Sequence, residues 1–435
     1  MPPVTPLSLL YLAVPAALSG MLNNAFKVID QYAVQGLGTE AQAAIASTTF
    51  VLIIFFAGYA IISSGAITLI SRAVGASDTP LQQQFIGNAL IGSLLVGVLI
   101  LSLSYHLAPW TTATLGLTGD AAVMAETYLR WHALFCLPQA IAPTLDAIFI
   151  AYGRTKTILL LQITASSLNF LLNPFFIYSC DLGIGGAALA TGLSQAVSVF
   201  IGFGLLFRMI KPTFTHYRPT TALIRIVKIG LPLSWSTLLF AGVYTAIIKW
   251  VIAPLGTPLN AALGIGFSVL EGFTWPVFWG FSVAIASIVG RALGAGQLPF
   301  AQSAIRYAFF MLTAAGLIAS AIFWFGAEPL AQIFTQDPAV LQHTLLYAHI
   351  LAFSQLFVAY EALSEGVLSG AGATLTIFLW SAPFNLLRIP LCWLFAIHYG
   401  YGAAAIWWVI NATTVVKAGG KAYAVWRGKW KTLTV

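Results

Sequence analysis

Charged residues are scarce in this chain, and their scarcity excludes an ordinary water-soluble fold. Only 7% of the 435 residues are Asp, Glu, Lys or Arg, whereas 59% are hydrophobic. Soluble domains usually carry about 25% charged residues. A soluble protein of this composition would have to hide more apolar surface than its interior can hold. The composition therefore indicates a membrane protein.

The chain also has few cysteines and histidines, and it lacks a phosphate-binding motif. The three cysteines, Cys136, Cys180 and Cys392, are odd in number and lack metal-ligand spacing, so neither a disulfide framework nor a zinc site is expected. The six histidines are scattered, which leaves no catalytic constellation and predicts that the protein is not an enzyme. No glycine-rich segment ends in the Gly-Lys-Ser/Thr of an ATP-binding loop. If the protein transports a solute against its concentration gradient, an ion gradient must then supply the energy. We expect no cofactor beyond a coupling ion.

Twelve apolar segments account for most of the chain, each near or above the about 20 residues that a helix needs to cross a hydrocarbon core. They are apolar on all sides rather than at every second residue, which excludes a barrel and leaves only helices. We predict an all-α polytopic membrane protein with twelve transmembrane helices. The expected spans are residues 7–33, 42–71, 81–105, 121–151, 157–179, 186–209, 225–253, 260–288, 300–325, 340–370, 374–398 and 402–426.

The sequence contains an internal repeat. Matching residues of the two copies are 217 to 219 positions apart. Because each copy has an even number of helices, both copies should have the same orientation and be related by a pseudo-twofold axis along the membrane normal. We expect an N-lobe at residues 1–210, a cytoplasmic linker at 211–224 and a C-lobe at 225–435. The matching positions are Pro15 with Pro232, Leu37 to Thr39 with Leu255 to Thr257, Arg72 to Ala76 with Arg291 to Ala295, and Gly183 with Gly400.

The net charge of +7 is explained by topology rather than by nucleic acid. Of the 19 basic residues, 15 lie in loops or tails on one side of the expected bundle, Lys417 and Lys421 among them. The positive-inside rule then predicts that both termini are cytoplasmic. Attraction to anionic lipid headgroups is the expected further role of this charge.

Nine ionisable residues fall inside the predicted spans, where each costs about 3 kcal/mol or more unless it has a partner or water. Asp30 is the most informative, with Lys27 one helical turn before it. The two would either neutralise each other as an intrahelical ion pair or leave Asp30 free to change its charge. The full set is Lys27, Arg130, Lys249, Arg388, Asp30, Asp146, Glu271, Glu361 and Glu365.

Polar residues in the fifth and sixth spans are candidate partners of Asp30. Asn169 and Asn173 lie at i and i+4, and Thr191 lies just inside the outer end of the next span. Their amides and hydroxyl can hydrogen-bond a carboxyl group or supply oxygens to a small cation. The alternative is that they only hold neighbouring helices together.

The second copy offers candidate substrate-binding residues. Glu271 and Arg388 are expected at similar depths, as a structural pair or as a carboxylate that binds substrate beside an Arg. Glu271 and Trp275 at i and i+4 would suit an organic cation, through charge and cation–π attraction. Glu361 shares a helix face with Glu365 and would either bind substrate or be a solvated carboxylate near the cytoplasmic end.

Five sets of short segments are distributed over both copies of the repeat. They are Val28-Ile29-Asp30 with Gly36-Leu37-Gly38 and Ala41 to Ala44, Ser71 to Ala76, Leu168-Asn169 with Asn173 to Ile177, Gly185 to Thr191, and Gly290 to Gly296. With twelve helices, the repeat and this order of segments, nearly the whole chain resembles the multidrug and toxic compound extrusion family.

The resemblance implies a V-shaped pair of six-helix lobes that exports amphipathic, often cationic drugs in exchange for H⁺ or Na⁺. In prokaryotic members an Asp on helix 1, an Asn and an Asp on helix 5 and a Thr on helix 6 form the ion site, which fall here on Asp30, Asn169, Asn173 and Thr191. Asn173 replaces a carboxylate, and one less negative charge beside Lys27 favours H⁺ over Na⁺. We expect a monomer in the prokaryotic cytoplasmic membrane that contacts lipids and no nucleic acid.

Other classes remain as alternatives. A lipid-linked oligosaccharide flippase of the same superfamily would need a cationic cleft for pyrophosphate, for which only Lys27, Lys249 and Arg388 are candidates. A major-facilitator carrier also has six plus six helices, but its charged Gly-Asp-Arg-Gly-Arg-type signature is absent between the second and third spans.

Overall fold

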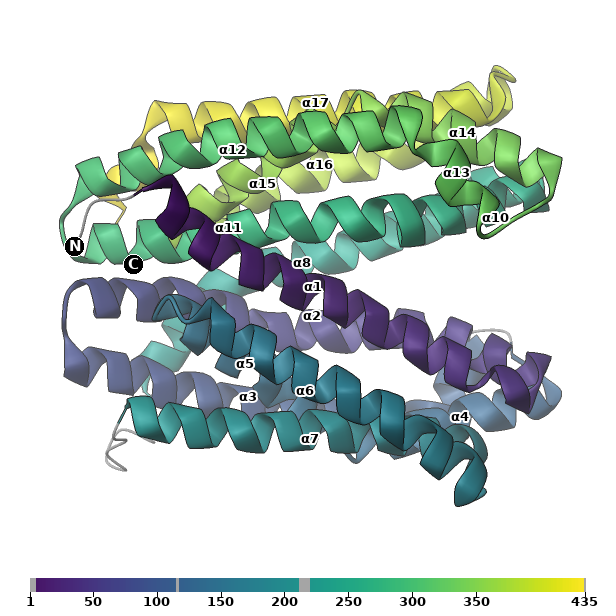
Figure 1. Ribbon diagram of the computed structural model, residues 1–435, viewed down its shortest axis with the longest axis horizontal. Helices are drawn as coiled ribbons and strands as arrows, with labels where there is room; N and C mark the ends of the chain where they lie inside the picture. Colours follow the sequence, from purple (N-terminus) through teal and green to yellow (C-terminus); the bar gives the residue numbers. More distant parts are fainter. Residues whose placement is uncertain (1–4, 115–116, 211–219, 434–435) are drawn as a thin grey trace. The chain divides into compact units, whose positions relative to one another are not determined.

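The computed structural model describes residues 5–114, 117–210 and 220–433, and every regular element in these ranges is a helix (Figure 1). Nine helical segments in this part are long and apolar enough to cross a membrane, or eleven when each of two bent helix pairs counts as one span. α17 (Gly402–Arg427) is the remaining long helix, and Asn411 and Lys417 lower its hydropathy. The prediction of an all-helical polytopic protein is confirmed.

The first compact unit, the N-terminal unit, comprises Ser19–Ser234. In it α2 packs against α3 and α5, and α6 lies beside α7 (Figure 1). Its elements are the second part of α1 (Pro6–Ala33), η1 (Gln35–Leu37), α2 (Thr39–Gly75), α3 (Thr79–Thr114), α4 (Gly119–Ala133), α5 (Cys136–Ala151), α6 (Thr155–Pro174), η2 (Phe175–Ser179), α7 (Gly183–Met209) and the start of α8 (Thr221–Ile247).

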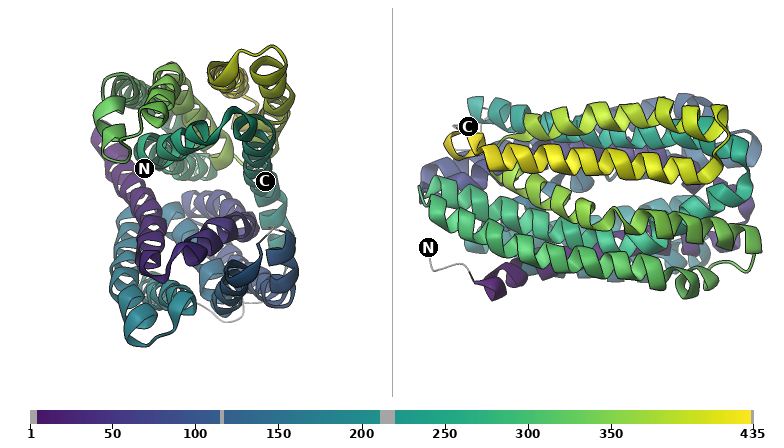
Figure 2. Two further views of the ribbon diagram at one scale, coloured as in Figure 1. Left: turned by 90° about the vertical axis from the view of Figure 1, so that its right-hand side faces the viewer. Right: turned by 90° about the horizontal axis from the view of Figure 1, so that it is seen from above.

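The second compact unit, the C-terminal unit, comprises Met1–Leu18 and Trp235–Val435. Here α15 packs against α11, α12 and α17, and α16 packs against α17 (Figure 2). Its further elements are η4 (Ile248–Ile252), α9 (Ala253–Leu255), α10 (Thr257–Ile265), η5 (Gly266–Glu271), α11 (Gly272–Gly294), α12 (Leu298–Phe325), α13 (Ala327–Gln332), α14 (Pro338–Ala352), α15 (Gln355–Gly370), α16 (Thr374–Cys392), η6 (Trp393–His398), α17 and η7 (Lys429–Thr432).

These units differ from the expected lobes at helices α1 and α8, because each of them begins in one unit and ends in the other. The reason is close backbone packing at glycines. A methyl group on Gly230 would lie 1.7 Å from the carbonyl oxygen of Ile61, and one on Gly280 would lie 2.6 Å from that of Ala13. Of the expected linker at 211–224, residues 211–219 lie outside the described part, and α8 begins at Thr221.

Two predicted spans, 121–151 and 340–370, are bent helix pairs rather than single helices. α4 and α5 meet at 58°, and α14 and α15 meet at 55°. At the first break the amides of Leu134 and Phe135 donate to carbonyls three residues earlier, and those of Phe353 and Ser354 do the same at the second. This tightening to i–3 hydrogen bonds ends one helix and redirects the chain.

Two π-helical turns explain why the repeat offset drifts. The offset is 217 at Pro15, 218 at Gly38 and 219 at Arg72. η4 lies within the first interval of the second copy and η5 lies within the second, whereas α1 and α2 carry no π-helical turn at the matching positions. A π turn closes its hydrogen bonds one residue later than an α turn, so it takes up one inserted residue without breaking the helix.

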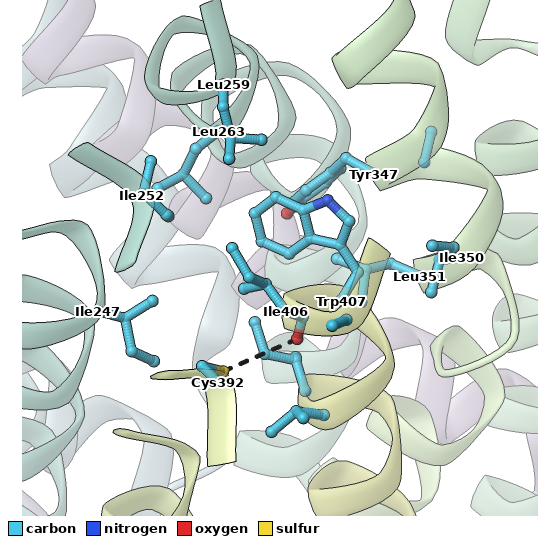
Figure 3. Packing of buried hydrophobic residues seen from close by; sticks show 14 of the residues in the cluster. Ile247, Ile252, Leu259, Leu263, Tyr347, Ile350, Leu351, Cys392, Ile406 and Trp407 are labelled. Atoms are coloured by element: carbon cyan, nitrogen blue, oxygen red, sulfur yellow. Dashed lines mark hydrogen bonds between the residues drawn. The ribbon is translucent and has the colours of Figure 1, made fainter. Parts of the chain in front are cut away.

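The apolar core of the C-terminal unit gathers around Tyr347 and Trp407, whose rings meet edge to face at 4.8 Å (Figure 3). Both side chains are fully buried. Cys392 lies in this core with its thiol toward the carbonyl of Ile406 (Figure 3). Cys392 is therefore a packing residue.

Candidate functional site

Asp30 lies one helical turn before the end of α1 and is buried in the N-terminal unit, with 7% of its surface exposed. Three side chains donate hydrogen bonds to its carboxylate. Asn169 and Asn173 each donate to Oδ1 at 2.9 Å, and Thr191 donates to Oδ2 at 2.9 Å. The four residues that the sequence selected as one site are therefore in direct contact.

The secondary structure explains how these donors converge. Asn169 and Asn173 are four residues apart on α6, so they share one face. Thr191 lies on α7, which packs along α6, and Gly186 permits close contact because a methyl group there would lie 2.6 Å from the carbonyl oxygen of Phe176. Asp30 thus lies where α1 meets a closely packed helix pair.

The hydrogens of this network are fully used. Asn169 also donates to the Thr191 hydroxyl at 3.1 Å, and Asn173 also donates to Asn169 Oδ1 at 3.2 Å. The amide oxygen of Asn173 is buried and has no partner among the described residues. Asp30 therefore receives only donors, which suits an ionised carboxylate. A proton on Asp30 would need an acceptor, such as a rearranged Thr191 hydroxyl or the amide oxygen of Asn173.

The side chain of Lys27 lies outside the described residues. Its pairing with Asp30 stays a prediction. No cluster of three or more His, Cys, Asp or Glu side chains that would suit a metal occurs in the described part of the chain. Oxygens for a cation near Asp30 would have to come mainly from the two amides and the hydroxyl.

In the C-terminal unit Glu271 and Arg388 do not form the ion pair considered from the sequence. Glu271 ends η5 and accepts a hydrogen bond from the Tyr347 hydroxyl at 2.7 Å. Arg388 is buried and donates to Thr413 at 2.8 Å and to Thr414 at 2.9 Å, both on α17. Each group is satisfied by a neutral hydroxyl partner instead.

Trp275 lies on α11 one turn after Glu271, and 54% of its surface is exposed. Glu271 itself is partly buried and is held toward α14 by Tyr347. The helical spacing of the two residues agrees with the sequence. A direct contact between the indole and the carboxylate is not among the interactions of the described residues.

Glu361 is not a solvated carboxylate, because two lysines neutralise it. Lys421 lies 2.6 Å and Lys417 3.2 Å from its Oε1, and Lys421 also lies 2.5 Å from Glu365. Both lysines are buried on α17, so the expectation that they lie in a cytoplasmic loop or tail is wrong. The matching i, i+4 spacings of the two Glu and the two Lys are the signal in the sequence, but spacing alone does not show that α15 and α17 face each other.

Comparison with known proteins places this architecture in a family. The sequence profile of the MatE family matches the chain twice, at residues 15–175 and 232–394, which is one match for each copy of the repeat. A probable multidrug resistance protein NorM of Thermotoga maritima is 23% identical over 98% of this chain and 93% of its own length. A FAD transporter of Shewanella oneidensis is 27% identical over 79% of this chain and 77% of its own length.

Solved structures show the same fold. The structure described as the outward-facing conformation of a multidrug resistance MATE family transporter of the MOP superfamily has a TM-score of 0.90, at 23% identity, over 98% of this chain and 96% of that one. A MOP superfamily transporter from Pyrococcus furiosus, described as having a binding pocket of reverse polarity, has a TM-score of 0.90 at 21% identity over the same shares. The chain belongs to the MatE family and is a multi-pass membrane transporter, not an enzyme.

Proposed function

We propose that the protein is a cation-coupled antiporter that exports amphipathic organic cations, with Asp30 as the coupling carboxylate and H⁺ as the coupling ion. The observation that carries this proposal is the buried Asp30 carboxylate, bound by three donors from two other helices. The names of relatives support the substrate class, since they include probable multidrug resistance protein NorM and multidrug export protein MepA.

The hydrogen-bond network supports a proton rather than Na⁺. Na⁺ is a hard cation that is bound through oxygen atoms, as Ca²⁺ and Mg²⁺ are. Around Asp30 both asparagines present N–H groups to the carboxylate, and Asp30 is the only carboxylate of the four residues. A proton needs no ring of oxygen ligands. A proton only has to neutralise the Asp30 carboxylate, which would weaken the three hydrogen bonds that Asp30 accepts.

Coupling follows from reciprocity between the two ligands. A proton on Asp30 removes the charge that holds α1 to α6 and α7, and α1 contains the flexible points Pro15 and Gly20. If the resulting change weakens drug binding, drug binding must weaken proton binding by the same free energy. External acid then loads Asp30 and releases drug outward, and proton loss to the cytoplasm resets the carrier.

The substrate site is proposed to lie in the C-terminal lobe, with Glu271 and Trp275 as the residues for a cationic group. Arg388 and Glu361 are proposed as secondary residues of this site, because Arg388 is already hydrogen-bonded to threonines and Glu361 is already paired with lysines. We further propose a monomer in the cytoplasmic membrane with both termini in the cytoplasm and membrane lipids around it.

The decisive experiment is transport in proteoliposomes. Efflux of a fluorescent organic cation is followed under an imposed pH gradient and, separately, an imposed Na⁺ gradient. Asp30→Asn should abolish the pH-driven component and leave a folded protein, whereas Asp120→Asn, an exposed position in the first turn of α4, should transport like wild type. Unchanged pH-driven efflux in Asp30→Asn would remove Asp30 from this role.

The same vesicles distinguish the alternatives. FAD is included as a substrate because a 27% identical relative is named a FAD transporter. A lipid-linked oligosaccharide is included for the flippase alternative. Movement of either one with no movement of the organic cation would replace the proposed substrate class.

A further inference from the structure

An apolar groove of about 360 Å³ opens on the C-terminal unit between the end of α8 and α16. Its lining residues are Trp250 from η4, Ile389 and Pro390 from α16, and Trp393 from η6. The two tryptophans keep 55% and 47% of their surfaces exposed. Because these residues lie in membrane-spanning segments, the groove is a place for hydrocarbon.

Two groups that can bind anions lie next to lining residues of the groove. Lys249 immediately precedes Trp250 in the same π-helical turn, and its side chain is exposed. His398 stacks on Trp393, with ring centroids 5.8 Å apart and planes 20° apart. The segments 248–256 and 386–401 contain no Asp or Glu. Arg388, next to Ile389, is directed into the protein toward Thr413 and adds nothing to this surface.

The tyrosines that follow His398 in the sequence indicate how deep His398 lies in the membrane. Tyr399 and Tyr401 are 56% and 67% exposed, and their rings lie 6.1 Å apart. Exposed tyrosine and tryptophan residues collect at the boundary between hydrocarbon and headgroups. His398 therefore lies near headgroup level. Lys249 lies on η4, which packs against η6, and its long exposed side chain can extend toward the same level.

The N-terminal unit also has a groove between the repeat-related pair of helices. It measures about 340 Å³ and lies between α1 and α6, lined by Ile29, Ser166, Ser167, Phe170 and Leu171. The residue after Ile29 is Asp30, which is buried and bound to α6 and α7. Both copies thus have a groove between these helices. In the first copy the buried Asp30 adjoins the lining residue Ile29, whereas in the second the exposed Lys249 adjoins Trp250.

We infer that the groove of the C-terminal unit binds an anionic phospholipid. The phosphate lies at Lys249 with His398 beside it, and one acyl chain lies against Trp250, Pro390 and Trp393. Lysine is a common phosphate ligand in proteins. One lysine near a membrane surface attracts an anionic lipid by about 1 kcal/mol, which corresponds to about fivefold in affinity.

Native mass spectrometry of the full-length protein, delipidated in detergent, tests this inference. Dioleoyl phosphatidylglycerol and dioleoyl phosphatidylcholine are titrated in parallel, so that the two lipids differ only in the headgroup. Wild type should bind the first lipid more tightly. Lys249→Gln should lose about fivefold in affinity for phosphatidylglycerol and keep its affinity for phosphatidylcholine.

Two further variants complete the design. Lys429→Gln removes an exposed lysine outside the groove, one of the 15 basic residues expected to attract anionic lipid in general, and should lose clearly less affinity for phosphatidylglycerol than Lys249→Gln. Trp393→Leu shortens the groove wall and should weaken both lipids by the same factor. Equal binding of the two lipids by wild type, or a Lys249→Gln variant indistinguishable from Lys429→Gln, would overturn the inference. So would tighter binding of a cationic dye than of phosphatidylglycerol at this groove.

Discussion

The ammonium group of Lys421 lies 2.6 Å from the carboxylate of Glu361, and the lysine side chain has no exposed surface. The same ammonium group also contacts Glu365, and Lys417 contacts Glu361 from one turn earlier on α17. Removing one partner of such a buried cluster leaves uncompensated charge in a medium of low polarity. That arrangement makes the cluster a strong constraint on how α15 and α17 pack.

Lys421→Met should therefore destabilise the protein strongly. Breaking a buried ion pair by removal of one partner costs about 3–5 kcal/mol. Thermal unfolding in detergent, followed by circular dichroism, should show a clear fall in melting temperature. Arg130→Gln is the control, since Arg130 and Glu126 form an exposed pair worth about 0–1 kcal/mol. Equal melting temperatures of the two variants would contradict the importance of the cluster.

Asn173→Asp should shift the coupling ion toward Na⁺. The substitution places a second carboxylate beside Asp30, and a second negative charge favours a bound cation. We expect Na⁺ affinity to rise by about tenfold, which corresponds to about 1.4 kcal/mol. Efflux under an imposed Na⁺ gradient in proteoliposomes measures the change. Asn173→Ala lacks the added charge and should gain no Na⁺ dependence; a gain in both variants would argue against the electrostatic explanation.

Gly230→Ala should disrupt the contact between α8 and α2. The added methyl group would lie 1.7 Å from the carbonyl oxygen of Ile61, so one helix has to move. Overpacking of this kind costs about 1–3 kcal/mol. The matched control is Gly242→Ala in the same helix, where no atom lies within 4 Å of the new methyl group. Helix propensity alone should stabilise Gly242→Ala by up to about 1 kcal/mol.

The apparent melting temperatures of these two glycine variants should then move in opposite directions. A stable Gly230→Ala variant would mean that the backbones of α2 and α8 do not approach as closely as described. A destabilised Gly242→Ala variant would indicate an unrecognised requirement for glycine in the second half of α8.

Tyr347→Phe should distinguish two contributions of Tyr347 to stability, its hydrogen bond to Glu271 and its packing in the core. The ring keeps its edge-to-face contact with Trp407, and only the hydrogen bond to Glu271 is lost. A hydrogen bond to a charged group contributes about 1.5–3 kcal/mol. The unfolding free energy should fall by this amount in wild type, and by less when Glu271→Gln is already present. An equal loss in both backgrounds would mean that Tyr347 acts through packing alone.

The sequence was sufficient for the fold class and for the residues around Asp30. Asn169 and Asn173 share a helix face by their spacing alone, and Thr191 is a polar residue at the matching end of the next span. It was not sufficient for Lys417 and Lys421, because counting hydropathy along the chain assigns a charged helix end to water. Only the facing helix, with Glu361 and Glu365 at the same spacing, makes their burial favourable.

By itself the sequence determined that this protein is a duplicated helical bundle for the membrane, because chain hydropathy and internal similarity need no knowledge of packing. The tertiary structure decided how the two copies differ. η4 and η5 take up the two inserted residues of the second copy as π turns, and the first half of α1 packs with the second copy rather than with its own. It also decided that Arg388 binds two threonines and Glu271 a tyrosine. The threonines are 25 and 26 residues from Arg388 and the tyrosine is 76 residues from Glu271, so only close packing brings these partners together.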